Sequence, residues 1–126
     1  MKAVFPEAQS TQPVTMKRGT ITSGFGLAAR QLVTRRCRLY QLSLVTTGAR
    51  HYIMLFDTTS APSAGATPDW IEAIAAFAAG GGGQLQVDFG QYGLAFANGI
   101  YVAASTTAPT LTFAASNAFI GAYQYA

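Results

Sequence analysis

The feature that most constrains this chain is the strict alternation of polar and apolar side chains over residues 84–89. Leu85, Val87 and Phe89 fall on one face of an extended segment, and the intervening positions hold Gln and Asp. A period of two is typical of a strand that buries one face, whereas the apolar positions of a helix recur every three or four residues. Such a segment must bury its apolar face against a second layer.

Other short apolar runs are bounded by turn-forming residues in the same way. Residues 46–48 (Thr-Thr-Gly) and 98–99 (Asn-Gly) are turn signals between them. About seven or eight short strands at this spacing predict an all-β fold, a single β-sandwich or jelly roll. The predicted strands are residues 36–45, 51–57, 69–79, 84–89, 94–96, 100–104, 110–114 and 118–125.

Two of these runs carry more specific expectations. Simple alternation along the first run places Tyr40 and Leu44 on one face and Cys37 on the other. Residues 51–57 are apolar on both faces, which predicts a central strand. The two runs are close enough along the chain for a hairpin.

Residues 69–79 leave two interpretations open. Asp69 and Glu72 have the spacing of a helix capping box, and alanines follow them. The apolar residues of the segment do not make a clean helical stripe, however. We therefore favour a strand that enters a turn at Gly80–Gly83.

A chain of 126 residues is expected to form one domain. Residues 1–29 predict an extended basic N-terminal arm, because Pro6, Pro13 and many Gln, Ser, Thr and Gly residues interrupt any periodicity. Residues 30–126 are the predicted β-sandwich domain. We expect no signal peptide, since Pro6 and Glu7 interrupt the first apolar residues, and no membrane-spanning segment.

The charges are few and unevenly placed. Only 10% of the residues are charged, and residues 1–50 hold all eight Lys and Arg residues with one acid, a net charge of +7. This asymmetry predicts a segment that binds an acidic partner surface, although a solvated basic face remains the alternative. The predicted partner-binding residues are Lys17, Arg18, Phe25, Arg30, Arg35, Arg36 and Arg38.

The low charge also bears on oligomeric state. Residues 89–126 carry no charged side chain, and interface cores are depleted in charge. We therefore predict a homo-oligomer. Phe119, Tyr123 and Tyr125 are the predicted subunit-interface residues.

Few side chains in this chain are suited to catalysis. The single cysteine and single histidine, Cys37 and His51, are interpreted as a packed thiol and a rim imidazole. Asp57 and Asp88 end apolar strands and are interpreted as turn formers that bond to local amides. We expect no enzyme, catalytic residue, transition-metal site or cofactor, while a calcium site stays open because backbone carbonyl ligands are invisible in sequence.

Nucleic acid is a further candidate partner for the basic residues. No recognised nucleic-acid motif accompanies them. Arginine is equally suited to bidentate pairing with carboxylates at a protein interface. We therefore predict a protein partner and consider nucleic acid unsupported.

The runs at residues 52–57, 88–90, 92–100 and 102–108, with an Ala/Pro/Gly loop that ends at Pro68, form a broader pattern. From Tyr40 to Tyr125 this pattern resembles small virion structural proteins of tailed bacteriophages. The resemblance implies a compact β-sandwich in many copies, an extended segment at residues 70–77 and no shared catalytic residues.

The same resemblance suggests a place in the virion, after synthesis in the host cytoplasm. The preferred hypothesis is a capsid decoration (cement) protein, a homotrimer that stabilises the head. It binds the major capsid protein or another virion protein through the basic N-terminal arm. The alternative is a tail, collar or fibre component that binds a glycan, and a cellular β-module is a third possibility. The aromatics available for glycan stacking are Trp70, Tyr92, Tyr101, Tyr123 and Tyr125.

Overall fold

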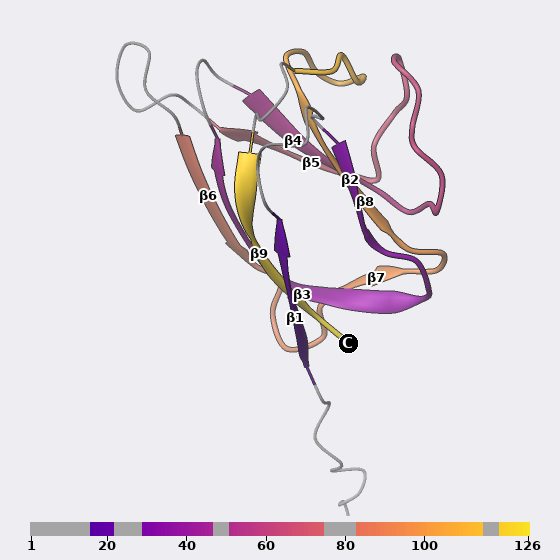
Figure 1. The fold of residues 1–126 in the computed structure, drawn as a ribbon, viewed down its shortest axis with the longest axis vertical. Helices are drawn as coiled ribbons and strands as arrows, with labels where there is room; N and C mark the ends of the chain where they lie inside the picture. Colours follow the sequence, from indigo (N-terminus) through magenta and orange to yellow (C-terminus); the bar gives the residue numbers. More distant parts are fainter. Residues whose placement is uncertain (1–15, 22–28, 47–50, 75–82, 115–118) are drawn as a thin grey trace, which may run out of the picture.

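The computed structural model describes residues 16–21, 29–46, 51–74, 83–114 and 119–126. These residues form nine strands and no helix (Figure 1). The strands are β1 (Lys17–Ile21), β2 (Ala29–Val33), β3 (Cys37–Thr46), β4 (His51–Phe56), β5 (Trp70–Ile74), β6 (Gly83–Asp88), β7 (Leu94–Phe96), β8 (Ile100–Ser105) and β9 (Phe119–Tyr125).

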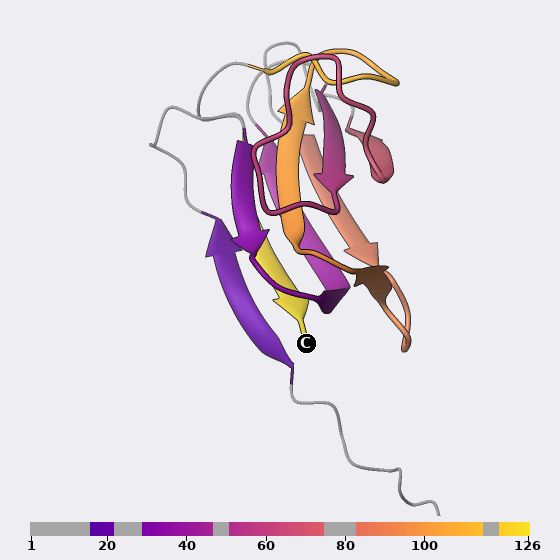
Figure 2. The ribbon, with the colours of Figure 1, turned by 90° about the vertical axis from the view of Figure 1, so that its right-hand side faces the viewer.

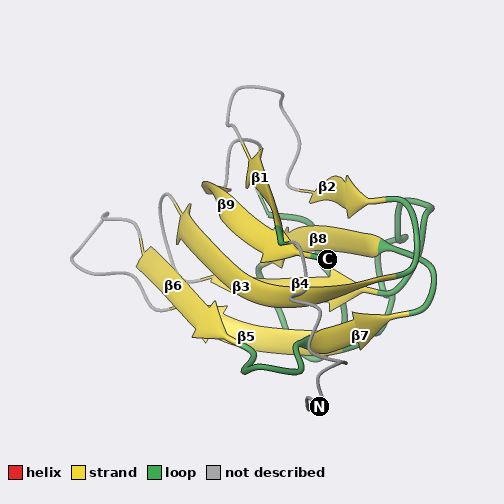
Figure 3. Ribbon diagram, turned by 90° about the horizontal axis from the view of Figure 1, so that it is seen from below, coloured by secondary structure: helices red, strands yellow, loops and turns green. Residues whose placement is uncertain are grey.

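The strands pair into two antiparallel sheets that face each other (Figure 3). The large sheet has the order β1-β9-β3-β6, with β7 also paired to β3, and the small sheet has the order β2-β8-β4-β5. This arrangement confirms the predicted all-β sandwich.

Inward-facing side chains of both sheets form one hydrophobic core. Leu42 and Leu44 from β3 pack with Leu55 from β4 and Val102 from β8, and all four are at most 1% exposed. Burying a side chain of this size contributes about 1.5–3 kcal/mol to stability. The core therefore holds the two sheets together through their central strands.

The small sheet is buried on its outer face as well. Met54 and Phe56 of β4 point outward, and they pack with Leu111 in a second hydrophobic cluster. The loop between β4 and β5 and the segment after β8 lie over this face (Figure 2), where the Leu111 amide donates to the Ala66 carbonyl and the Gly65 amide to the Leu111 carbonyl. The prediction of a central strand apolar on both faces is thereby confirmed for β4.

The large sheet leaves its outer face open to solvent. Gln41 and Gln86 on this face are exposed, and Val45 is 48% exposed. We refer to this surface as the open face. Its residues are Arg18, Thr20, Gln41, Ser43, Val45, Gln84, Gln86, Asp88, Ala122 and Gln124.

The predicted face assignment of β3 is wrong because of a β-bulge at Tyr40. The register against β9 shifts between Leu39 and Gln41, so Tyr40 is an extra residue in the ladder. A bulge reverses the alternation that follows it. Cys37 and Leu39 before the bulge, and Leu44 after it, all face the core.

The predicted arm is corrected at its C-terminal part. Residues 17–21 form β1, an edge strand paired with β9, and β2 begins at Ala29. Gly19 and Ile21 are the two residues of β1 that face the interior of the sandwich. Two positions are too few for the alternation of a strand to be recognised in the sequence. Residues 1–15 of the predicted arm lie outside the described residues.

Two other predictions are also wrong. β3 and β4 lie in opposite sheets, so they do not form the predicted hairpin. Residues 110–114 contain only an isolated bridge between Phe113 and Ser105. The buried Ser105 hydroxyl accepts hydrogen bonds from the amides of Thr107 and Thr112, which holds the segment as a loop.

The open choice at residues 69–79 is settled for its first half. Trp70–Ile74 is strand β5, which pairs with β4 as an edge of the small sheet. A strand is favoured because the edge lets the polar side chain of Glu72 stay exposed. Residues 75–79 lie outside the described residues.

A first prediction concerns Gly121, which lies opposite Leu44 in the ladder between β3 and β9. A Cβ atom there would overlap the Ser43 carbonyl oxygen and approach Leu44 Cδ2 to 2.7 Å. Gly121→Ala is expected to lower the free energy of unfolding by about 3 kcal/mol, because overpacking against backbone displaces the strand. Urea denaturation measures the loss.

The matched control is Ala122→Ser, at the next position on the open face, which is expected to change stability by less than about 0.5 kcal/mol. Full stability of Gly121→Ala would show that β9 does not approach β3 so closely.

Candidate functional site

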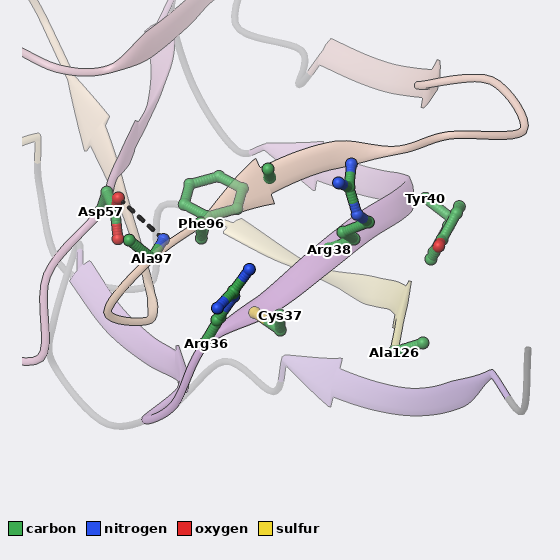
Figure 4. A pocket seen from close by; sticks show the side chains of 9 residues that line it. Arg36, Cys37, Arg38, Tyr40, Asp57, Phe96, Ala97 and Ala126 are labelled. Carbon is green, nitrogen blue, oxygen red and sulfur yellow. Dashed lines mark hydrogen bonds between the residues drawn. The ribbon is translucent and has the colours of Figure 1, made fainter.

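A pocket at one end of the sandwich is lined by two exposed arginines, Arg36 and Arg38. Its volume is about 710 Å³. We call it the cationic pocket (Figure 4). Its lining residues are Arg36, Cys37, Arg38, Tyr40, Asp57, Ala95, Phe96, Ala97 and Ala126.

The bend between β2 and β3 supplies the cations. Arg36 precedes Cys37 and Arg38 follows it, so the buried Cys37 separates two exposed guanidinium groups (Figure 4). The Arg35 guanidinium carbon lies 5.8 Å from the centre of the Tyr125 ring, a cation–π geometry. Arg35 and Arg36 of the bend and Arg38 of β3 thereby present positive charge at the same end of the molecule.

Arg38 is held in place on both its backbone and its side chain. Its Nη1 donates to the Tyr92 carbonyl oxygen at 2.9 Å. Its amide donates to the Ala126 carbonyl at 2.8 Å, and the Ala126 amide donates back at 3.0 Å. A guanidinium has five N–H donors, so most of them remain available to a bound partner.

Asp57 forms the opposite wall of the pocket and organises the connection from β7 to β8 (Figure 4). Its carboxylate accepts from the backbone amides of Ala97 at 3.0 Å, Asn98 at 2.8 Å and Gly99 at 3.3 Å. Partial burial opposes ionisation of the carboxyl, but these amides and the Asn98 side chain together hold the pKa of Asp57 below its ordinary value. Asp57 therefore stays charged and serves the fold.

The role found for Asp57 corrects the sequence interpretation in one respect. It binds backbone amides as predicted, but those amides lie about 40 residues further along the chain and not in its own turn. Asp88 does bind locally, because its Oδ1 accepts from the Gly90 amide at 2.8 Å. The two carboxylates line different pockets and do not form a pair.

Cys37 is buried, as the sequence predicts. Burial raises the pKa of its thiol, against the opposing effect of Arg35, so the thiol is protonated at neutral pH. His51 begins β4 in the other sheet, beyond the far end of β3. A Cys–His pair is therefore excluded by the topology.

The structure brings together only some of the predicted partner-binding residues. Arg35, Arg36 and Arg38 meet at the pocket end, and Lys17 joins them opposite Tyr125 in the ladder. Arg18 points instead to the open face, where its ladder partner is Gln124.

Two further members of that set lie elsewhere. Arg30 is a half-buried residue of β2 and makes an interaction within the chain. Phe25 lies outside the described residues.

Two of the aromatic residues predicted for the subunit interface, Tyr123 and Tyr125, make contacts within the protomer. The Tyr123 hydroxyl donates to the Leu32 carbonyl at 3.0 Å, and the Tyr123 and Tyr125 rings stack at 5.5 Å between centroids. The side chain of Phe119 lies outside the described residues. Their contact with a second subunit stays a prediction.

The sequence did not point to several features of the site. Phe96, which lines the cationic pocket, belongs to β7. This strand has only three residues, too few to show an alternating pattern in the sequence. The Tyr92 carbonyl that holds Arg38 is a backbone group, which no side-chain pattern reveals. Tyr92 itself is 75% exposed, whereas Trp70 packs edge-on against Phe89 at 5.4 Å.

The described residues contain no cluster of three or more His, Cys, Asp or Glu side chains suited to a metal ion. They also contain no helix long and apolar enough to span a membrane. Comparisons with protein-family models, curated proteins and solved structures found no match. The two arginines of the pocket suit a carboxylate-bearing partner.

A second prediction follows from the bonds of Asp57. Asp57→Asn replaces one acceptor oxygen by an amide donor that faces a backbone N–H, so we expect about 1–3 kcal/mol less stability at pH 7. Because the folded pKa of Asp57 lies below its unfolded value, its contribution is present above the unfolded pKa and is lost as the pH falls through the folded pKa.

Urea denaturation of both proteins from pH 7 into the acid range measures this effect. The gap between wild type and Asp57→Asn is expected to narrow as the pH falls. A gap that stays constant over that range would contradict the role given to the ionised carboxylate.

Proposed function

We propose that this chain is a non-enzymatic structural protein of a tailed-bacteriophage virion, of the capsid decoration type. It binds an acidic surface of the major capsid protein through the cationic pocket, and several copies act together. The virion setting is supported by the resemblance over Tyr40–Tyr125. The mode of binding is supported by the pocket.

The observation that carries the proposal is the exposed pair formed by Arg36, in the bend before β3, and Arg38, on β3. Arg38 already has its side chain fixed by the Tyr92 carbonyl, so it loses little conformational freedom when it binds. The carboxylate side chain that lines the pocket, Asp57, is committed to three backbone amides. The guanidinium groups of Arg36 and Arg38 are therefore available to bind carboxylates of another molecule.

The position of the basic residues refines the proposed mode of binding. Residues 1–15 contain one base, Lys2, and one acid, Glu7, so their net charge is zero. The other bases of the predicted arm, Lys17 and Arg18, lie on β1, and the arginines at the pocket end follow the arm in the sequence. A copy binds through the sandwich itself, and avidity between copies strengthens the attachment.

A tail, collar or fibre component remains the second candidate, and one observation favours it. Tyr92 is 75% exposed beside Arg38, on a turn held by glycines with positive φ at Gly90 and Gly93. An exposed aromatic ring next to a guanidinium is suited to stacking on a sugar. The binding target separates the two candidates.

The third prediction tests the proposal with genome-free shells that lack this protein. Wild-type protein is expected to co-sediment with the shells, and binding is expected to weaken as salt is raised. Arg36→Gln with Arg38→Gln is expected to weaken binding at least tenfold, which corresponds to about 1.4 kcal/mol.

The matched control is Ser63→Asp with Thr67→Asp, which lowers the net charge equally at exposed loop positions that do not line the pocket. Equal weakening by both double variants would assign binding to net charge and overturn the role of the pocket. Binding to isolated tails but not to shells would overturn decoration and support the second candidate.

A further inference from the structure

The open face of the large sheet is unlike the outer face of the small sheet. Loops bury the outer face of the small sheet around Met54 and Leu111, whereas Gln41, Gln86 and Val45 of the open face stay exposed. Two adjoining hollows of about 380 and 230 Å³ lie on it and share Gln41, Ser43 and Gln86. The open face is a shallow surface that no covering element occupies in the described part of the chain.

The side chains of the open face form rows across the strands. The ladder pairs Arg18 with Gln124, Gln124 with Gln41, and Gln41 with Asp88. A second row, parallel to the first, is Thr20, Ala122, Ser43 and Gln86. The first row therefore begins with a cation on edge strand β1 and ends with an anion on edge strand β6.

The centre of the open face carries no charged side chain. Solvent-exposed sheet faces ordinarily carry interspersed charges, which keep sheets from associating. Here the middle strands β9 and β3 present amide, hydroxyl and small side chains together with the apolar Val45 between the two charged ends. Depletion of charge from the centre of a patch is typical of an interface.

We propose that the open face binds the open face of a second copy of this chain, related by a two-fold axis that runs parallel to the strands between β9 and β3. This operation places Arg18 of one copy over Asp88 of the other, and Gln124 over Gln41. Strands lie about 4.8 Å apart, so the charged ends are separated by about 14 Å and are matched in both halves of the dimer. An axis perpendicular to the strands would instead place like charges together.

The charged groups on and beside the open face are compatible with this pairing. Arg18 makes no ion pair with any described residue, so it is available to a partner. Asp88 uses Oδ1 for the Gly90 amide and leaves Oδ2 for a guanidinium. Arg38 is bonded to the Tyr92 carbonyl, on the side of the β6–β7 turn and away from the axis.

The inference is independent of the proposed function, because it concerns only the purified chain. The fourth prediction compares the wild-type protein with three variants by sedimentation velocity at micromolar concentrations. Wild type is expected to sediment as a dimer. Arg18→Asp and Asp88→Arg are each expected to raise the dimer dissociation constant at least tenfold, and Arg18→Asp combined with Asp88→Arg is expected to restore it.

The restored double variant is the decisive arm, since loss of folding cannot produce a rescue. The two single variants change the net charge in opposite directions, so an effect of net charge alone would not weaken the dimer in both. Asp88→Asn is a further control that keeps the Gly90 hydrogen bond while it removes the charge, and it should weaken the dimer to a smaller extent. A monomeric wild type, a trimer indifferent to all variants, or a double variant as weak as the singles would each overturn the proposal.

Discussion

The large sheet depends on β3 and on the bulge that Tyr40 introduces into it. β3 pairs with β9 on one side and with β6 and β7 on the other, so no other strand joins so much of the sandwich. The bulge lets Cys37 and Leu39 face the core before it and Leu44 face the core after it. Arg38 is thereby directed outward at the pocket end. One irregular residue therefore sets both the core and the cationic pocket.

Much of the fold follows from local pattern, and the remainder follows from contacts that no local pattern encodes. The alternation at residues 84–89 predicts β6, and the two-sided run at 51–57 predicts a strand buried on both faces. The sequence could not reveal that β3 and β4 belong to different sheets, because neighbouring strands satisfy the same pattern whether they pair or cross. Nor could it reveal β1, whose stability comes from a partner strand about 100 residues away.

The candidate site, too, is partly visible in the sequence and partly a result of the tertiary structure. The identity of the arginines and their bias toward the first half of the chain are visible in the sequence, which is why Arg36 and Arg38 were predicted to bind a partner. Their separation from Arg18 is not visible, because it depends on the pairing and register that set the place of each residue in the sheet. Asp57 was interpreted as a turn former, and only the tertiary structure shows that it holds a distant turn.

The two surfaces place a joint constraint on how copies of this chain assemble. The residues that line the cationic pocket and those of the open face do not overlap, so the two proposed contacts use different side chains. A two-fold axis parallel to the strands preserves strand direction, and it therefore leaves both pockets of a dimer at the same end. Both pockets then face one surface, where the second attachment becomes intramolecular and raises avidity without any new contact. An axis perpendicular to the strands would point the pockets in opposite directions, so the charge pattern of the open face and the position of the pocket favour the same geometry.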